Sequence, residues 1–140
     1  MKYLLPLIAA LLIISCKTTH IVKYEYKSTT MLGSRVITVT QDSVVSNFRG
    51  RTSPTRSARA TTPEEWTELK ASVANLKLDE ISDLEAPTNK RATDASPYGS
   101  VMLSTKDSTY HSSAFDGYNS NKKLLPLMAV MQKIAAKVGN

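Results

Sequence analysis

The chain has 140 residues, of which 41% are hydrophobic and 21% are charged, and its formal net charge at pH 7 is +6. This length favours a single domain that buries a hydrophobic core without disulfides or a structural metal. The one cysteine excludes an internal disulfide. The basic excess suits an anionic partner, although solubility alone accounts for many charges of this size.

The first sixteen residues have the pattern of a cleaved export signal. Lys2 precedes an apolar run over residues 4–14, which is about half of the roughly 20 residues that a membrane-spanning helix needs. Ordinary signal-peptidase sites have small residues at positions −3 and −1, but Ile13 would occupy position −3 here. The end of the run, Ile-Ile-Ser-Cys at residues 13–16, instead resembles the lipobox of bacterial lipoproteins.

The resemblance to bacterial lipoproteins implies that residues 1–15 are a signal peptide and that Cys16 becomes acylated, which would anchor the chain in a lipid bilayer. One acyl chain holds a protein at a bilayer only marginally, whereas two or three anchor it stably. Residues 16–20 would be a tether and residues 21–140 a domain. The tether holds no acidic residue, which favours an outer-membrane lipoprotein facing the periplasm. This address argues against a nucleic-acid partner. The alternative is an uncleaved anchor that ends in a lone cysteine.

Three strands are predicted before residue 50. Alternation over residues 21–28 predicts a half-buried strand with Val22, Tyr24 and Tyr26 on its buried side. β-branched residues predict a second strand over residues 35–40. A third strand, over residues 44–49, would close an antiparallel meander.

Residues 50–62 are rich in Arg, Ser, Thr and Pro and have no apolar periodicity, so we expect an exposed, mobile loop. With the end of the third strand, this loop carries four arginines and no acidic residue: Arg49, Arg51, Arg56 and Arg59. Guanidinium groups bind phosphates and carboxylates in a bidentate manner. These arginines are therefore a candidate site for an anionic envelope component, and the alternative is a solvated loop without a ligand.

A capping box marks the start of the first helix. Thr62 is followed by Pro63 and, three residues on, by Glu65, which predicts a helix from residue 63. Apolar residues then recur at helical spacing, and we expect the helix to end at residue 76 or 77. A turn over residues 78–84 should pack on the core, and residues 85–99 should form a long polar loop.

Two further strands and a final helix complete the expected fold. The strands are predicted at residues 100–105 and 108–115, with a tight turn between them at Lys106 and Asp107. The helix is predicted over residues 122–137, capped by Ser120, with one apolar face at helical spacing: Leu124, Leu127, Met128, Met131, Ile134, Ala135 and Val138. The order βββ-α-ββ-α predicts an α+β fold, an antiparallel sheet of about five strands with both helices packed on one face.

The sequence offers little catalytic chemistry. His111, Ser113 and Asp116 lie close together and allow a hydrolase hypothesis, but no nucleophile-elbow motif accompanies them. Ser120 and Lys123 form an S-x-x-K pair without the companion motifs of penicillin-binding proteins. The acidic residues at positions 79, 80, 83 and 85 lack the spacing of a calcium loop. We therefore predict no metal site, no cofactor and no enzymatic activity.

Three tyrosines around the second hairpin are further binding candidates, because tyrosine is favoured at recognition surfaces: Tyr98, Tyr110 and Tyr118. The alternative is that they are half-buried core residues. Residues 114–127 resemble small uncharacterised lipoproteins of Bacteroidota-type bacteria, a resemblance that implies no activity. The sequence thus predicts a membrane-anchored envelope lipoprotein with a non-catalytic binding or structural module. The alternatives are a small periplasmic ligand-binding or inhibitor domain and, less favoured, a hydrolase.

Overall fold

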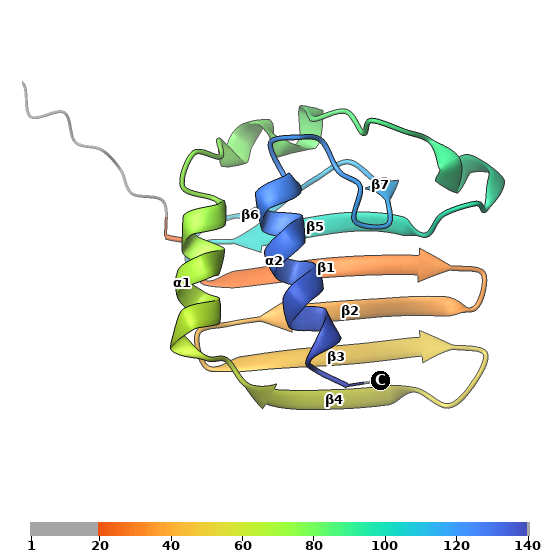
Figure 1. Cartoon of the computed structure of the whole chain (residues 1–140), viewed down its shortest axis with the longest axis horizontal. Coiled ribbons are helices and arrows are strands. Elements are labelled where there is room, and N and C mark those ends of the chain that lie inside the picture. The colour runs from red at the N-terminus through yellow and green to blue at the C-terminus, as the bar shows by residue number, and fades with distance from the viewer. Residues whose placement is uncertain (1–19, 140) are drawn as a thin grey trace, which may run out of the picture.

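Seven antiparallel strands form one sheet in the computed structural model, which describes residues 20–139 (Figure 1). The strand order across the sheet is β4-β3-β2-β1-β5-β6, and β7 also pairs with β5. The predicted lipidation site Cys16 and the predicted signal peptide lie outside the described residues. In chain order, the strands are β1 (Lys23–Thr30), β2 (Gly33–Val39), β3 (Ser43–Gly50), β4 (Thr55–Ala60), β5 (Tyr98–Ser104), β6 (Thr109–His111) and β7 (Phe115–Asp116).

Two helices, α1 (Pro63–Ser72) and α2 (Leu125–Ala136), cover the same face of this sheet and pack against each other (Figure 1). Two short 3-10 helices, η1 (Leu78–Asp83) and η2 (Lys90–Thr93), lie in the connection between α1 and β5. The predicted α+β fold with both helices on one face is therefore confirmed, although the sheet has seven strands rather than the smaller number predicted.

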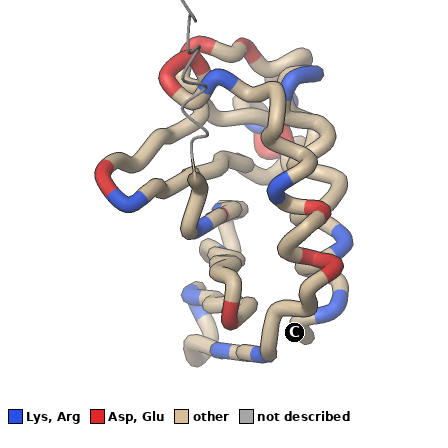
Figure 2. The backbone as a smooth tube through the Cα atoms, turned by 90° about the vertical axis from the view of Figure 1, so that its left-hand side faces the viewer, with Lys and Arg blue, Asp and Glu red and all other residues tan. Residues whose placement is uncertain are grey.

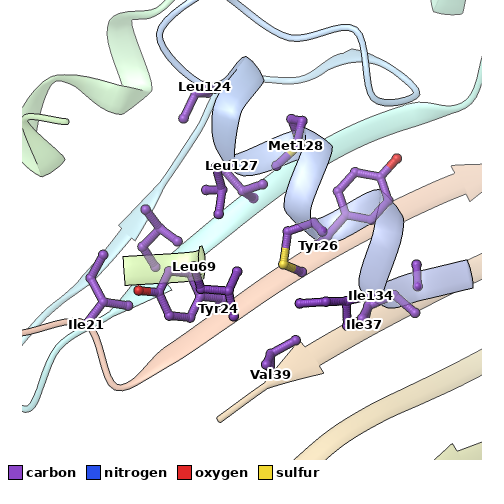
Figure 3. Close-up of a cluster of buried hydrophobic side chains, with 14 of the residues drawn as sticks. Ile21, Tyr24, Tyr26, Ile37, Val39, Leu69, Leu124, Leu127, Met128 and Ile134 are labelled. Atoms are coloured by element: carbon purple, nitrogen blue, oxygen red, sulfur yellow. The ribbon is translucent and has the colours of Figure 1, made fainter. Parts of the chain in front are cut away.

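The core lies between the sheet and the two helices. Figure 3 shows side chains of β1, β2, α1 and α2 meeting in this layer, among them Tyr24 and Leu69. Every apolar residue expected on the buried face of the last helix is buried. The core side chains of the described chain run from Ile21 to Val138. A protein that begins at residue 20 therefore contains all of them.

The start of α1 follows its local sequence. The Thr62 hydroxyl oxygen accepts a hydrogen bond from the Glu65 amide (3.2 Å), and the Glu65 carboxylate accepts one from the Thr62 amide (3.0 Å). The predicted capping box is confirmed. The helix ends at Ser72 rather than at residue 76 or 77, and the chain continues into η1, whose two buried apolar residues pack on the core as expected. Among residues 20–139, no helix has the length and apolar character to span a membrane.

The prediction of a mobile loop over residues 50–62 is wrong for residues 55–60, which form the edge strand β4. This strand pairs with β3 from Ser43↔Ala60 to Phe48↔Thr55. No residue of β4 is fully buried, so the strand needs no alternation of apolar residues. Charged side chains on an edge strand also oppose aggregation. Only residues 51–54 remain as a connection between the two strands.

The predicted strand over residues 108–115 is interrupted between β6 and β7. The hydroxyl oxygen of Ser112 accepts a hydrogen bond from the Val101 amide (3.0 Å), where a regular ladder would supply a backbone carbonyl. The Ser112 amide still donates to the Val101 carbonyl (3.0 Å). The side chain thus replaces one rung of the ladder, and the strand stops.

Three other local expectations are wrong. Val22 is 43% exposed, since β1 begins at Lys23, two residues later than predicted, and Ile21 enters the core instead. Ser120 does not cap α2, since its hydroxyl donates to the Asn121 carbonyl and the helix begins at Leu125. The expected polar loop over residues 85–99 contains η2 and the first residues of β5.

Candidate functional site

One face of the sheet carries no helix, and the strand register shows which side chains it presents. Tyr24 and Tyr26 of β1 point into the core, so Glu25 and Lys27 point to the other side of the sheet. We call this uncovered surface the open face. Two of its neighbouring rows run across the strands as Ser100–Lys27–Val36–Asn47–Arg56 and Tyr98–Thr29–Ser34–Arg49.

The open face carries more basic than acidic side chains, whereas the helix side carries both kinds. The acid of the open face is Glu25, which accepts a hydrogen bond from the Thr38 hydroxyl (3.2 Å) and lies 3.8 Å from the Lys23 ammonium group. In the rest of the described chain, acidic residues lie in helices, turns and loops, where Figure 2 shows them in red, and in β7. The open face carries cations at four positions: Lys23, Lys27, Arg49 and Arg56.

Three of these cations have no ion-pair partner among residues 20–139: Lys27, Arg49 and Arg56. Lys27 and Arg56 share a row and are three strand spacings apart, which is roughly 14 Å. Arg49 lies diagonally across from Arg56, about 7–8 Å away. The backbone positions of the three cations are spread over the open face and are not gathered around one point. The arrangement instead suits an extended anion or a surface with several negative charges.

The predicted group of four arginines is divided by the sheet. Arg49 and Arg56 lie on the open face, and the exposed Arg51 lies in the connection between β3 and β4. Arg59 is opposite Val44, so it points to the helix side. There its guanidinium donates two hydrogen bonds to the Glu65 carboxylate, of 2.8 and 2.9 Å. The expectation that all four arginines lack an acidic neighbour is therefore wrong for Arg59.

The Arg59–Glu65 pair joins the edge strand to the first turn of α1. Glu65 is 6% exposed, and it also caps the helix. The hydrogen bonds from Arg59 lower the pKa of the Glu65 carboxyl below its ordinary value, and they outweigh the opposing effect of burial. The Thr62 amide acts in the same direction. The pair is therefore a structural clamp rather than part of a ligand site.

The three candidate tyrosines do not form one surface. Tyr110 lies opposite Leu103 and packs against the core, and Tyr118 stacks on Tyr26 with ring centroids 4.4 Å apart. Tyr98 lies on the open face and is 48% exposed. Of the three, only Tyr98 therefore remains a candidate for recognition.

Exposed apolar side chains gather at the end of the sheet where β1 turns into β2. Met31 and Leu32 at this turn are 70% and 68% exposed. With Tyr98 they line a cleft of about 490 Å³ between the turn and the segment that leads into β5. Pro97 also lines the cleft, and Asp94 is its one acidic residue. The open face thus ends, at the β1–β2 turn, in an apolar margin.

Asp116 serves the fold rather than a reaction centre. Its carboxylate is 4% exposed and accepts hydrogen bonds from the Thr88 hydroxyl (2.5 Å) and from the amides of Lys90 (2.8 Å) and Arg91 (3.0 Å). The Arg91 guanidinium donates a further bond of 3.0 Å. Burial alone would raise the pKa of this carboxyl, but these hydrogen bonds hold it well below its usual range.

The other residues of the hydrolase hypothesis are not arranged around Asp116. The Ser113 hydroxyl donates to the Leu84 carbonyl (2.6 Å), and His111 lies opposite Met102 on the open face. No hydrogen bond joins His111, Ser113 and Asp116 to one another in the described part of the chain. They therefore form no triad in this structure.

The second motif also lacks a catalytic arrangement, since the Ser120 hydroxyl donates to the Asn121 carbonyl rather than to Lys123. Within residues 20–139, no group of three or more potential metal-ligating side chains comes together. The structure thus brings together cations and exposed apolar groups rather than nucleophiles or metal ligands.

No protein-family model, curated protein or solved structure matches this chain. The assignment of the open face therefore rests on its geometry. Sequence reasoning missed Lys27, Met31 and Leu32 as members of this surface. The alternation in β1 already placed Lys27 opposite the tyrosines, and Met31-Leu32 is an apolar pair inside a turn. The sequence thus indicated both features, but it did not show which residues lie beside them across the sheet.

Proposed function

We propose that this protein is a lipid-anchored, non-catalytic binding module of the bacterial envelope, and that its open face binds an anionic component there. The observation that carries the proposal is the excess of cations over acids on one face: Lys27, Arg49 and Arg56 project from it, and its acid Glu25 already has Lys23 beside it. Cations without local partners lose little when they bind an anion, because no existing ion pair must break.

The anchor is the second part of the proposal, and it rests on the lipobox resemblance at Cys16. His20, the first described residue, is exposed just before β1. Four residues, 17–20, would separate the anchor from the domain, and an extended chain of that length spans roughly 13 Å. The domain would therefore stay close to the bilayer that holds its lipid.

Mass spectrometry of the protein purified from bacterial membranes tests the anchor. We expect a mature chain that begins at Cys16 and carries acyl chains on that residue. A free thiol on Cys16, or a chain that retains residues 1–15, contradicts the proposed anchor.

Binding to fluorescent inorganic polyphosphate, a soluble polyanion, tests the open face in a chain that begins at residue 20. The triple variant Lys27→Gln, Arg49→Gln, Arg56→Gln should bind roughly tenfold more weakly or worse, since three exposed ionic contacts are lost. The affinity of the wild type should fall with added salt.

A matched control removes three exposed lysines away from the open face: Lys70, Lys122 and Lys123, each changed to Gln. This control loses the same net charge as the triple variant. It should keep nearly the affinity of the wild type. An equal loss of affinity in both triple variants would show that net charge alone drives binding, and it would refute a dedicated face.

A further inference from the structure

We propose that the anionic component is the surface of a lipid bilayer that contains anionic lipids, and that the domain docks on it side-on, with Met31, Leu32 and Tyr98 entering the interface. This inference rests on the proposed function, because it uses the same cations. It adds the apolar margin, which a soluble polyanion would leave without a role.

The apolar margin is held in a fixed shape. The Leu32 amide donates to the Thr30 hydroxyl oxygen (3.1 Å), and the Arg51 amide donates to the Leu32 carbonyl (3.3 Å). Gly33 and Gly50 face each other in the register of β2 and β3. These contacts hold the β1–β2 turn against the connection between β3 and β4. Met31 and Leu32 remain exposed on this turn.

Cations border these apolar groups. Arg51 follows directly after β3, next to Leu32, and Arg49 ends the row that begins at Tyr98. Exposed aliphatic side chains beside an aromatic ring and a set of Lys or Arg residues are the combination that binds at the boundary of headgroups and acyl chains. Basic groups attract anionic headgroups, and the apolar groups then leave water.

The point where the described chain enters β1 favours side-on docking. The described chain enters β1 at one end, and the β1–β2 turn lies at the other, as Figure 1 shows. Eight residues of β1 span roughly 26 Å. If the anchor holds the first end near the bilayer and the apolar margin touches the same bilayer, β1 lies parallel to the membrane. Lys27 of β1 then lies between the two contacts, and charge attraction turns the open face toward the lipid.

A bilayer fits the spacing of the cations better than a compact ligand does. The backbone positions of Lys27 and Arg56 are three strand spacings apart, and anionic lipids are likewise spread over a surface and can move to each cation. The cleft also holds Asp94, whose charge opposes an anionic surface. Asp94 has a φ of 57°, a backbone conformation that asparagine adopts readily. Asp94→Asn therefore removes the opposing charge with little change of shape.

Co-sedimentation with vesicles tests the inference, using the chain that begins at residue 20 so that no lipid anchor contributes. Vesicles of phosphatidylcholine alone are compared with vesicles that also contain phosphatidylglycerol. We expect binding to the anionic vesicles and roughly tenfold or more weaker binding to the neutral ones, from about a fivefold contribution of each basic side chain near the surface. Asp94→Asn should bind the anionic vesicles about fivefold more tightly.

The double variant Met31→Ser, Leu32→Ser separates bilayer docking from anion binding. It should bind anionic vesicles at least about tenfold more weakly, because burial of each apolar side chain contributes roughly that factor. It should bind polyphosphate as the wild type does. Circular dichroism would establish that the variant remains folded, as expected for two exposed residues of a turn.

The results distinguish this inference from the proposed function. If the wild type binds polyphosphate but not anionic vesicles, the partner is another anion, such as an acidic protein or polysaccharide, and bilayer docking is refuted while the proposed function stands. If the double variant binds anionic vesicles as well as the wild type does, the apolar margin does not enter the bilayer and side-on docking is refuted. If the wild type binds neither probe, the proposed function fails as well.

Discussion

The contact between Arg59 and Glu65 should be a main determinant of stability, because it ties the edge strand to the capping box. Glu65→Ala removes the side-chain acceptor of the capping box, which costs about 1 kcal/mol. It also leaves the Arg59 guanidinium without its two strongest bonds, and an unsatisfied charged donor costs about 1–3 kcal/mol. The Arg59 side chain is 25% exposed, so water can supply part of the lost hydrogen bonding. We expect Glu65→Ala to lower the free energy of unfolding by about 3 kcal/mol.

Urea unfolding followed by circular dichroism measures this loss, and a double-mutant cycle isolates the contact. Arg59→Ala should cost about 2 kcal/mol, because it leaves a nearly buried carboxylate with only the Thr62 amide. The double variant should cost less than the two single effects combined, by about 1 kcal/mol or more. Glu64→Ala, at an exposed position in the same turn, should cost about 0.5 kcal/mol at most. Strict additivity, or equal losses at positions 64 and 65, would refute the clamp.

The stability of the fold should also depend on pH and on the geometry of the β1–β2 turn. Because the folded-state pKa values of Asp116 and Glu65 are lowered, the unfolded chain binds more protons in acid than the folded chain does. The free energy of unfolding should therefore be level above about pH 5 and fall as the pH drops through the ordinary carboxyl range and below. Asp116→Asn should flatten this fall in urea titrations, and an unchanged slope contradicts the role of that carboxylate. Gly33→Ala should cost about 2 kcal/mol or more, because φ is +148° and the added methyl would lie 2.4 Å from the Arg49 carbonyl oxygen. Thermal unfolding of this variant is compared with that of Gly117→Ala, where the methyl meets no atom closer than 3.8 Å. Equal losses of stability in the two variants would contradict the steric argument.

Signals that depend on a few neighbouring residues were readable in the sequence. The capping box at Thr62 and Glu65 places two hydrogen-bonding groups one helical turn apart, so a segment of four residues defines it. The buried face of α2 follows from apolar residues at helical spacing, and all seven predicted residues are buried, although Leu124 and Val138 flank the helix. The end of α1 was less predictable, because apolar residues after Ser72 pack on the core from η1 as well as they would from a longer helix.

The edge strand β4 shows where local reasoning stops. Residues 55–60 have no alternation of apolar residues, and their strand conformation comes from pairing with β3. No residue of β4 is fully buried on either face, so burial imposes little pattern on its sequence. The polar Thr-Arg-Ser-Ala-Arg-Ala segment therefore looked like a loop. Its arginines also looked alike, although Arg56 points to the open face and Arg59 to Glu65.

The sequence by itself determined the candidate anchor, the fold class, the start of α1 and the buried face of α2, because each of these depends on residues close together in the chain. Only the tertiary structure decided which cations share a surface. Lys27 and Arg56 are separated by most of three strands in the chain, yet the register places them in one row. The side that they face depends on where α1 and α2 pack, and this choice is made by burial of the whole core rather than by any local pattern.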